Sequence, residues 1–96
     1  MVSRFEWDED KNRANLRKHG ISFEEAATIF DGPMLSLEDD SDPGEIRERS
    51  YGLIGGVVIA CVIHTDRDDT IRIISARKAT PNERKLFDAH LKRAAG

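Results

Sequence analysis

Hydrophobic and polar positions in the first third of the chain predict one short strand and two helices. Residues 4–7 alternate between charged and aromatic side chains, as a strand does. Residues 8–19 start with a capping Asp and end with basic residues before a glycine. These signals predict a helix, and because it is polar nearly all round it should lie on the surface. Residues 22–30 start with a capping box and carry an apolar stripe, which predicts a second helix.

The pattern then changes to strands. Residues 34–37 predict a short strand, and residues 38–45 an acidic loop without the ligand order of a calcium-binding EF-hand. Residues 46–54 alternate, and residues 57–63 form a continuous β-branched run typical of a central strand covered on both faces. Residues 70–79 predict a further strand.

Turns and a last helix complete the expected fold. Gly55-Gly56 and residues 66–69 predict the connections of an antiparallel arrangement. Residues 80–95 carry an apolar stripe and have Pro81 in the first turn, which predicts a closing helix. The order of elements predicts an α+β fold, with a mostly antiparallel sheet of four to five strands, two N-terminal helices and one C-terminal helix. Residues 1–96 are expected to form one domain.

Composition and charge exclude several classes of protein. A charged fraction of 34% and a hydrophobic fraction of 39% fit a globular chain, and no apolar run approaches the length of a membrane span. The N-terminus is too polar and acidic for a signal peptide, and the lone Cys61 is expected to be a buried small hydrophobe. We therefore expect a cytoplasmic protein.

The net charge of −3 conceals an asymmetry between the two halves of the chain. Residues 1–45 hold 5 Lys/Arg against 12 Asp/Glu, whereas residues 46–96 hold 10 against 6. This split has two interpretations. The basic half could form a surface for a polyanion, or the two halves could pair with each other across the fold.

Two arginines on the last predicted strand are the first candidates for an anion site. Strict alternation would place Arg72 and Arg77 on opposite faces, so that one of them lies beside the core and needs an anionic partner. Both could grip phosphate, or both could be paired structural arginines. An antiparallel hairpin would bring Arg72 close to Arg67 and leave Arg77 at the other end. A single site that contains both Arg67 and Arg77 would then need strand twist or long side chains to connect the two ends of the hairpin.

The chemistry that these residues could support is the cleavage of RNA without a metal. That reaction needs a base for the 2′-hydroxyl, cations for the charged phosphorane and an acid for the leaving oxygen. The candidate catalytic residues are Lys18, His19, His64, Asp66, Arg67 and Arg77. Structural roles compete with two of them: His64 could be a core-edge histidine bonded to a neighbour, and His19 could cap the first helix.

Candidate RNA-binding residues supply charge or a stacking surface. They are Arg47, Arg49, Arg72, Lys78 and Trp7. A lone tryptophan in a small domain is more often part of the core, and that alternative stays open for Trp7. No Walker motif, GxGxxG, HExxH or paired CxxC is present, so we predict no cofactor and no metal.

Several blocks of the sequence together resemble the BrnT-type toxins of bacterial type II toxin–antitoxin systems. They are Phe5-Glu6-Trp7-Asp8, Lys18-His19-Gly20-Ile21, His64-Thr65-Asp66-Arg67 and Ile71-Arg72-Ile73-Ile74-Ser75-Ala76-Arg77-Lys78-Ala79 followed by Glu83-Arg84. Among the candidate catalytic residues, the resemblance points to Lys18, His19, Asp66, Arg67 and Arg77. Two positions depart from the family pattern: Asp66 stands where Glu is frequent, and Phe87 where Tyr is common.

The resemblance implies a RelE-like fold and a metal-independent ribonuclease that inhibits translation. It also implies a cognate antitoxin with a ribbon-helix-helix domain, through which the complex binds operator DNA and represses its own operon. Two alternatives remain from the sequence. The chain could act by binding a protein target without cutting RNA, or it could serve only as a corepressor.

Overall fold

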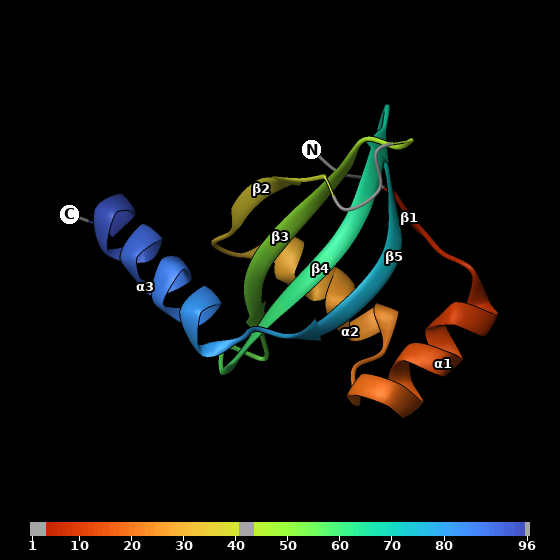
Figure 1. Ribbon diagram of the computed structural model, residues 1–96, viewed down its shortest axis with the longest axis horizontal. Helices are drawn as coiled ribbons and strands as arrows, with labels where there is room; N and C mark the ends of the chain where they lie inside the picture. Colours follow the sequence, from red (N-terminus) through yellow and green to blue (C-terminus); the bar gives the residue numbers. More distant parts are fainter. Residues whose placement is uncertain (1–3, 41–43, 96) are drawn as a thin grey trace.

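A five-stranded sheet forms the centre of the protein. The computed structural model describes residues 4–40 and 44–95, and Figure 1 shows the arrangement of the elements. The strands are β1 (Arg4–Glu6), β2 (Leu35–Asp39), β3 (Arg47–Ile54), β4 (Val58–Arg67) and β5 (Thr70–Lys78). Their order in the sheet is β1-β5-β4-β3-β2. Only β1 pairs in parallel, with β5, so the expectation of a mostly antiparallel sheet in an α+β fold is confirmed.

Helical segments connect β1 to β2 and follow β5. They are α1 (Glu9–His19), α2 (Phe23–Ala27), the short 3₁₀ helix η1 (Thr28–Asp31) and α3 (Pro81–Ala95). The expected caps are present: Asp8 accepts hydrogen bonds at the start of α1, Gly20 ends it at φ 73°, and Ser22 forms a capping box. The second helix was predicted over residues 22–30, but the α-helical part ends at Ala27, because the following turn tightens into the 3₁₀ helix η1.

Two predicted loops are partly strand in the structure. β4 continues through Asp66 and Arg67, which pair with Ile71 and Thr70, so the predicted turn at residues 66–69 shrinks to two residues. Asp68 makes this tight turn possible by adopting a φ of 54°. In the predicted acidic loop, Glu38 and Asp39 belong to β2 because they continue its pairing with β3. Residues 41–43 of that loop lie outside the described part.

The helices α1 and α2 and the segment η1 cover one face of the sheet, which we call the helix face. Figure 1 shows α2 behind the strands and α1 beside β5. The main hydrophobic core lies between these helices and the sheet. Its buried members are Ile21, Phe23, Ala26, Ile29, Ala60, Val62, Ile71, Ile73 and Ala76.

Two buried asparagines attach α1 to the rest of the fold. The Nδ2 of Asn15 donates to the carbonyl oxygens of Ala76 (2.8 Å) and Ile21 (2.9 Å). The Oδ1 of Asn12 accepts from the backbone N–H of Phe23 at 2.7 Å. The helix is polar and largely exposed, as expected, but it is anchored by amide hydrogen bonds where a typical surface helix uses an apolar stripe.

The opposite face of the sheet, which we call the arginine face, is covered only in part. A second cluster with buried Tyr51, Cys61, Ala79 and Phe87 lies where α3 begins. Figure 1 shows α3 leaving the end of β5 and extending to the side of the sheet. Burial raises the pKa of the Cys61 thiol, which fits a buried hydrophobe. Among the described helices, none is long and apolar enough to cross a membrane.

The close approach of η1 to β3 gives a test of the core. A Cβ added at Gly52 would lie 2.6 Å from the Cβ of Ile29, whereas one added at Gly32 would meet nothing within 4 Å. We expect Gly52→Ala to lower the free energy of unfolding by roughly 1–3 kcal/mol through overpacking. Gly32→Ala, as the matched control, should change it by less than about 0.5 kcal/mol. Urea unfolding of both variants measures this, and equal effects would contradict the packing described.

Candidate functional site

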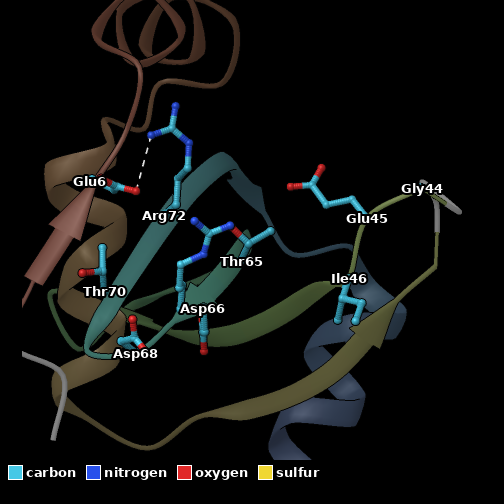
Figure 2. Close-up of a pocket in the computed structure, with 10 residues that line it drawn as sticks. Glu6, Gly44, Glu45, Ile46, Thr65, Asp66, Asp68, Thr70 and Arg72 are labelled. Carbon is cyan, nitrogen blue, oxygen red and sulfur yellow. Dashed lines mark ion pairs between the residues drawn. The ribbon is translucent and has the colours of Figure 1, made fainter.

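A pocket of about 760 Å³ lies at the end of the β4–β5 hairpin. Figure 2 shows side chains from β1, β4 and β5 and from the segment before β3 around it. Its lining residues are Glu6, Gly44, Glu45, Ile46, Thr65, Asp66, Arg67, Asp68, Thr70 and Arg72. Two guanidinium groups and several carboxylates therefore share one open concavity, an arrangement suited to a phosphate and to proton transfer.

The two arginines of the pocket come from neighbouring strands. Arg67 ends β4 opposite Thr70, and Arg72 on β5 lies opposite Thr65, as the hairpin prediction expected. The Nη1 of Arg72 lies 3.6 Å from the Oε1 of Glu6. Arg67 forms no ion pair with any residue in the described ranges 4–40 and 44–95. Arg67 thus presents an exposed positive charge to the pocket.

The predicted separation of Arg72 and Arg77 onto opposite faces is wrong. The pairing of β4 with β5 shifts by one residue, because Ile63 pairs with Ser75 while His64 pairs with Ile73. Ile74 is therefore the extra residue of a β-bulge, and a bulge reverses the alternation of side chains beyond it. Both arginines consequently lie on the arginine face.

Arg77 is held by an internal acid at the far end of β5. Its Nη1 and Nη2 atoms donate to the two carboxylate oxygens of Glu83 at 2.7 and 3.0 Å. The buried hydroxyl of Tyr51 also donates to Glu83, at 2.6 Å. The Arg77 guanidinium lowers the pKa of Glu83 to about 2, and the pKa of Arg77 is raised in return. Burial, with the carboxylate beside it, raises the pKa of Tyr51. Arg77 therefore joins α3 to the sheet and lies outside the pocket.

Asp66 and His64 form a hydrogen-bonded pair at the pocket. The Nδ1 of His64 lies 2.6 Å from the Oδ1 of Asp66, and its Nε2 lies 2.7 Å from the hydroxyl of Ser50. The side chain of His64 is only 1% exposed and that of Asp66 is 45% exposed. Asp66 can therefore touch a ligand in the pocket, whereas His64 is the bonded core-edge histidine that the sequence left as an alternative.

Glu48 lies near the same histidine, with its Oε2 at 3.9 Å from Nε2. The ligand-type atoms of Glu48, His64 and Asp66 all lie within 4.8 Å of one another. Both ring nitrogens of His64 lie within hydrogen-bond distance of protein oxygens, Asp66 at Nδ1 and Ser50 at Nε2. The absence of a metal stays a prediction from the sequence.

The arginines of β3 are paired with acids from the first half of the chain. Arg47 donates two hydrogen bonds to Glu45, at 2.8 and 3.0 Å. The Nε of Arg49 lies 3.5 Å from Asp39. The contacts of Arg49 with Asp39 and of Arg72 with Glu6 join separate strands, and they support the interpretation that the acidic and basic halves meet across the fold. Arg47 and Arg49 both lie on the arginine face.

The remaining predicted site residues lie away from the pocket. Lys18 and His19 end α1, three to four residues after Asn15, which bonds to Ala76 near the far end of β5. Lys78 ends β5 at that same far end. Since a strand rises about 3.3 Å per residue, the length of β5 separates these groups from Arg67 by roughly 20 Å or more. The predicted catalytic set therefore does not form one cluster.

Trp7 belongs to the edge of the core. Its ring packs edge-on against Phe23 with a centroid distance of 6.1 Å, and its Nε1 donates to Glu9 at 3.0 Å. These contacts support the core interpretation over the stacking one.

The sequence did not predict the hydrogen bond between Tyr51 and Glu83 or the one between Ser50 and His64. A signal for Glu83 exists, because Thr80 and Glu83 have the spacing of a capping box and do form one. The contacts of Tyr51 and Ser50 join residues 14 to 32 positions apart, and no local pattern marks them.

These observations define an α+β protein with an arginine-lined pocket at one end of its sheet. Comparisons with known proteins show the family to which the chain belongs. The model of the family described as the ribonuclease toxin BrnT of type II toxin–antitoxin systems matches residues 7–83. The crystal structure of the Brucella abortus ribonuclease toxin BrnT is similar, with a TM-score of 0.67 and 26% identity, over 82% of this chain and 99% of that chain. No curated protein matches the sequence significantly. The chain belongs to the BrnT toxin family.

The contact of Glu83 with Arg77 predicts a pH-dependent stability. Because the pKa of Glu83 is lowered from 4.5 to about 2 in the folded protein, the stability it contributes is full above pH 4.5 and is lost as the pH falls towards 2. Glu83→Gln should lower the free energy of unfolding by roughly 2–3 kcal/mol at pH 7, and by much less near pH 2.

Denaturant unfolding at pH 7, 5, 4, 3 and 2 measures this difference. Glu38→Gln, at an exposed glutamate, is the matched control and should follow the wild type at every pH. A constant difference between Glu83→Gln and the wild type across this range would contradict the assignment.

Proposed function

We propose that this chain cleaves RNA at the pocket without a metal ion. Two observations support the proposal: the family is one of ribonuclease toxins, and the pocket brings Asp66 together with Arg67 and Arg72. The second observation carries the assignment of the site. A carboxylate that can accept a proton and guanidiniums that can neutralise a phosphate are the groups that RNA cleavage needs.

The reaction assigned to these residues is an internal phosphoryl transfer. A carboxylate oxygen of Asp66 takes the proton of the ribose 2′-hydroxyl, and O2′ forms a bond to phosphorus. The bond from phosphorus to O5′ breaks, and O5′ takes a proton from water. The hydroxide left behind takes the proton from Asp66 and restores its carboxylate. Arg67 and Arg72 hold the phosphate oxygens while negative charge develops on them, so the positive charge comes from the protein. The products are a 2′,3′-cyclic phosphate and a 5′-hydroxyl.

The other predicted residues receive different roles in this proposal. Arg47 and Arg49 lie on the same arginine face, each beside an acid, and they would contact the RNA beyond the cleaved bond. Arg77 acts by fixing α3 through Glu83. Lys18, His19 and Lys78 lie at the other end of β5, so we assign them no part in the bond-breaking step.

Membership of a type II toxin–antitoxin family implies a cognate antitoxin as a partner of this chain. We further propose that this antitoxin has a ribbon-helix-helix domain. The toxin would reach operator DNA only through it, and the cytoplasmic complex would repress its own operon. RNA cleavage would inhibit translation whenever the antitoxin is lost.

The activity is tested with the purified protein and a fluorescent RNA oligonucleotide in EDTA. We expect cleavage in EDTA, and we expect Arg67→Ala and Arg72→Ala each to lower kcat/KM by roughly 10²- to 10³-fold through loss of charge stabilisation. Arg17→Ala, at an exposed arginine of α1, is the matched control and should leave kcat/KM unchanged.

Three results would contradict the proposal. Activity that disappears in EDTA and returns with Mg²⁺ would exclude the metal-free reaction. Cleavage that survives both pocket substitutions would exclude this site. Toxicity on expression without RNA cleavage would favour a toxin that acts by binding a protein.

Binding of the antitoxin should depend on salt. Exposed cations such as Arg67 would attract acidic side chains of the antitoxin, and salt screens such attraction. We expect the Kd of the complex to rise steeply as NaCl increases from 50 to 500 mM, with the association rate changing most. Surface plasmon resonance measures both quantities, and a flat response would show that apolar contacts dominate.

A further inference from the structure

We propose that His64 is a positioning residue for Asp66. The buried imidazole holds one carboxylate oxygen of Asp66 and leaves the other oxygen for the 2′-hydroxyl of RNA. This inference rests on the proposed function only in taking Asp66 as the base. It reassigns His64, because a side chain that is 1% exposed does not reach the RNA itself.

The position of His64 is fixed from three sides. Its ring and that of Phe30 form a T-shaped contact, with a centroid distance of 5.0 Å and an interplanar angle of 87°. Its Nε2 lies 2.7 Å from the hydroxyl of Ser50, which is fully buried. Its Nδ1 lies 2.6 Å from Asp66. The ring therefore has little room to rotate, and it transmits this rigidity to the carboxylate.

The hydrogen-bond partners also select the tautomer of His64. An ionised carboxylate can only accept, so the hydrogen of a neutral imidazole lies on Nδ1 and is donated to Asp66. Nε2 is then an acceptor, and the hydroxyl of Ser50 donates to it. The Ser50 oxygen can in turn accept from the hydroxyl of Ser36, 2.8 Å away on β2. Every member of this chain of hydrogen bonds has a partner.

Substitutions at His64 separate the positioning role from a purely structural one. His64→Phe keeps the ring shape and removes both nitrogens, whereas the amide of His64→Asn can still donate a hydrogen bond to Asp66. We expect kcat to fall roughly 10²-fold in His64→Phe and about 10-fold in His64→Asn, with KM nearly unchanged in both. His90→Asn on α3 is the matched control, and its kcat should equal that of the wild type.

Two results would overturn the positioning role. One is a folded His64→Phe with wild-type kcat. The other is a kcat of His64→Asn no higher than that of His64→Phe, because only the amide can still donate a hydrogen bond to Asp66.

A measurement without RNA keeps this inference separate from the proposed function. Nitrogen NMR of the wild-type protein reports which ring nitrogen carries the hydrogen at neutral pH. We expect the Nδ1–H form, and Asp66→Asn should change the Nδ1 signal. The Nε2–H form would overturn the positioning role whether or not the protein cleaves RNA. Should His64→Phe fail to fold, this measurement and His64→Asn decide the question.

Discussion

Ile74 is the extra residue in the pairing of β4 with β5, and the positions of the charged side chains on β5 follow from it. Without the bulge, Arg77 would point into the core beneath the helices, where an unpaired guanidinium costs several kcal/mol. With the bulge, Ile71 and Ala76 both face that core although they are five residues apart. One strand thereby supplies apolar side chains to the helix face and both arginines to the arginine face.

The local acids then determine which of these arginines can bind an anion. Glu83 holds Arg77 with two short hydrogen bonds in a partly buried site, and a phosphate would have to replace a well-formed ion pair there. Arg72 has a longer contact with Glu6 at an exposed site, where ion pairs contribute roughly 0–1 kcal/mol. Arg67 forms no ion pair within the described residues. The arginine face thus divides into a structural end at α3 and an open end at the hairpin.

The open end is also where groups from the two faces of the sheet can meet. Asp66 follows the alternation of the helix face, whereas Thr65 and Arg67 follow that of the arginine face. Along most of β4 the sheet separates such neighbours. At the last residues of the hairpin, residues that follow both alternations line the same pocket. A carboxylate and a guanidinium can therefore be adjacent in sequence and still belong to a single pocket.

The sequence by itself determined the features that depend on neighbours along the chain. The caps at Asp8, Gly20 and Ser22, the hairpin that brings Arg67 close to Arg72, and the α+β order of elements were all predictable, because each follows from local geometry or strand alternation. The tertiary structure alone decided the bulge at Ile74 and the burial of His64 against Ser50. It also decided that Lys18 and His19 lie far from the pocket. These depend on the register between strands and on packing between segments far apart in sequence, where the energy of the whole core outweighs any local preference.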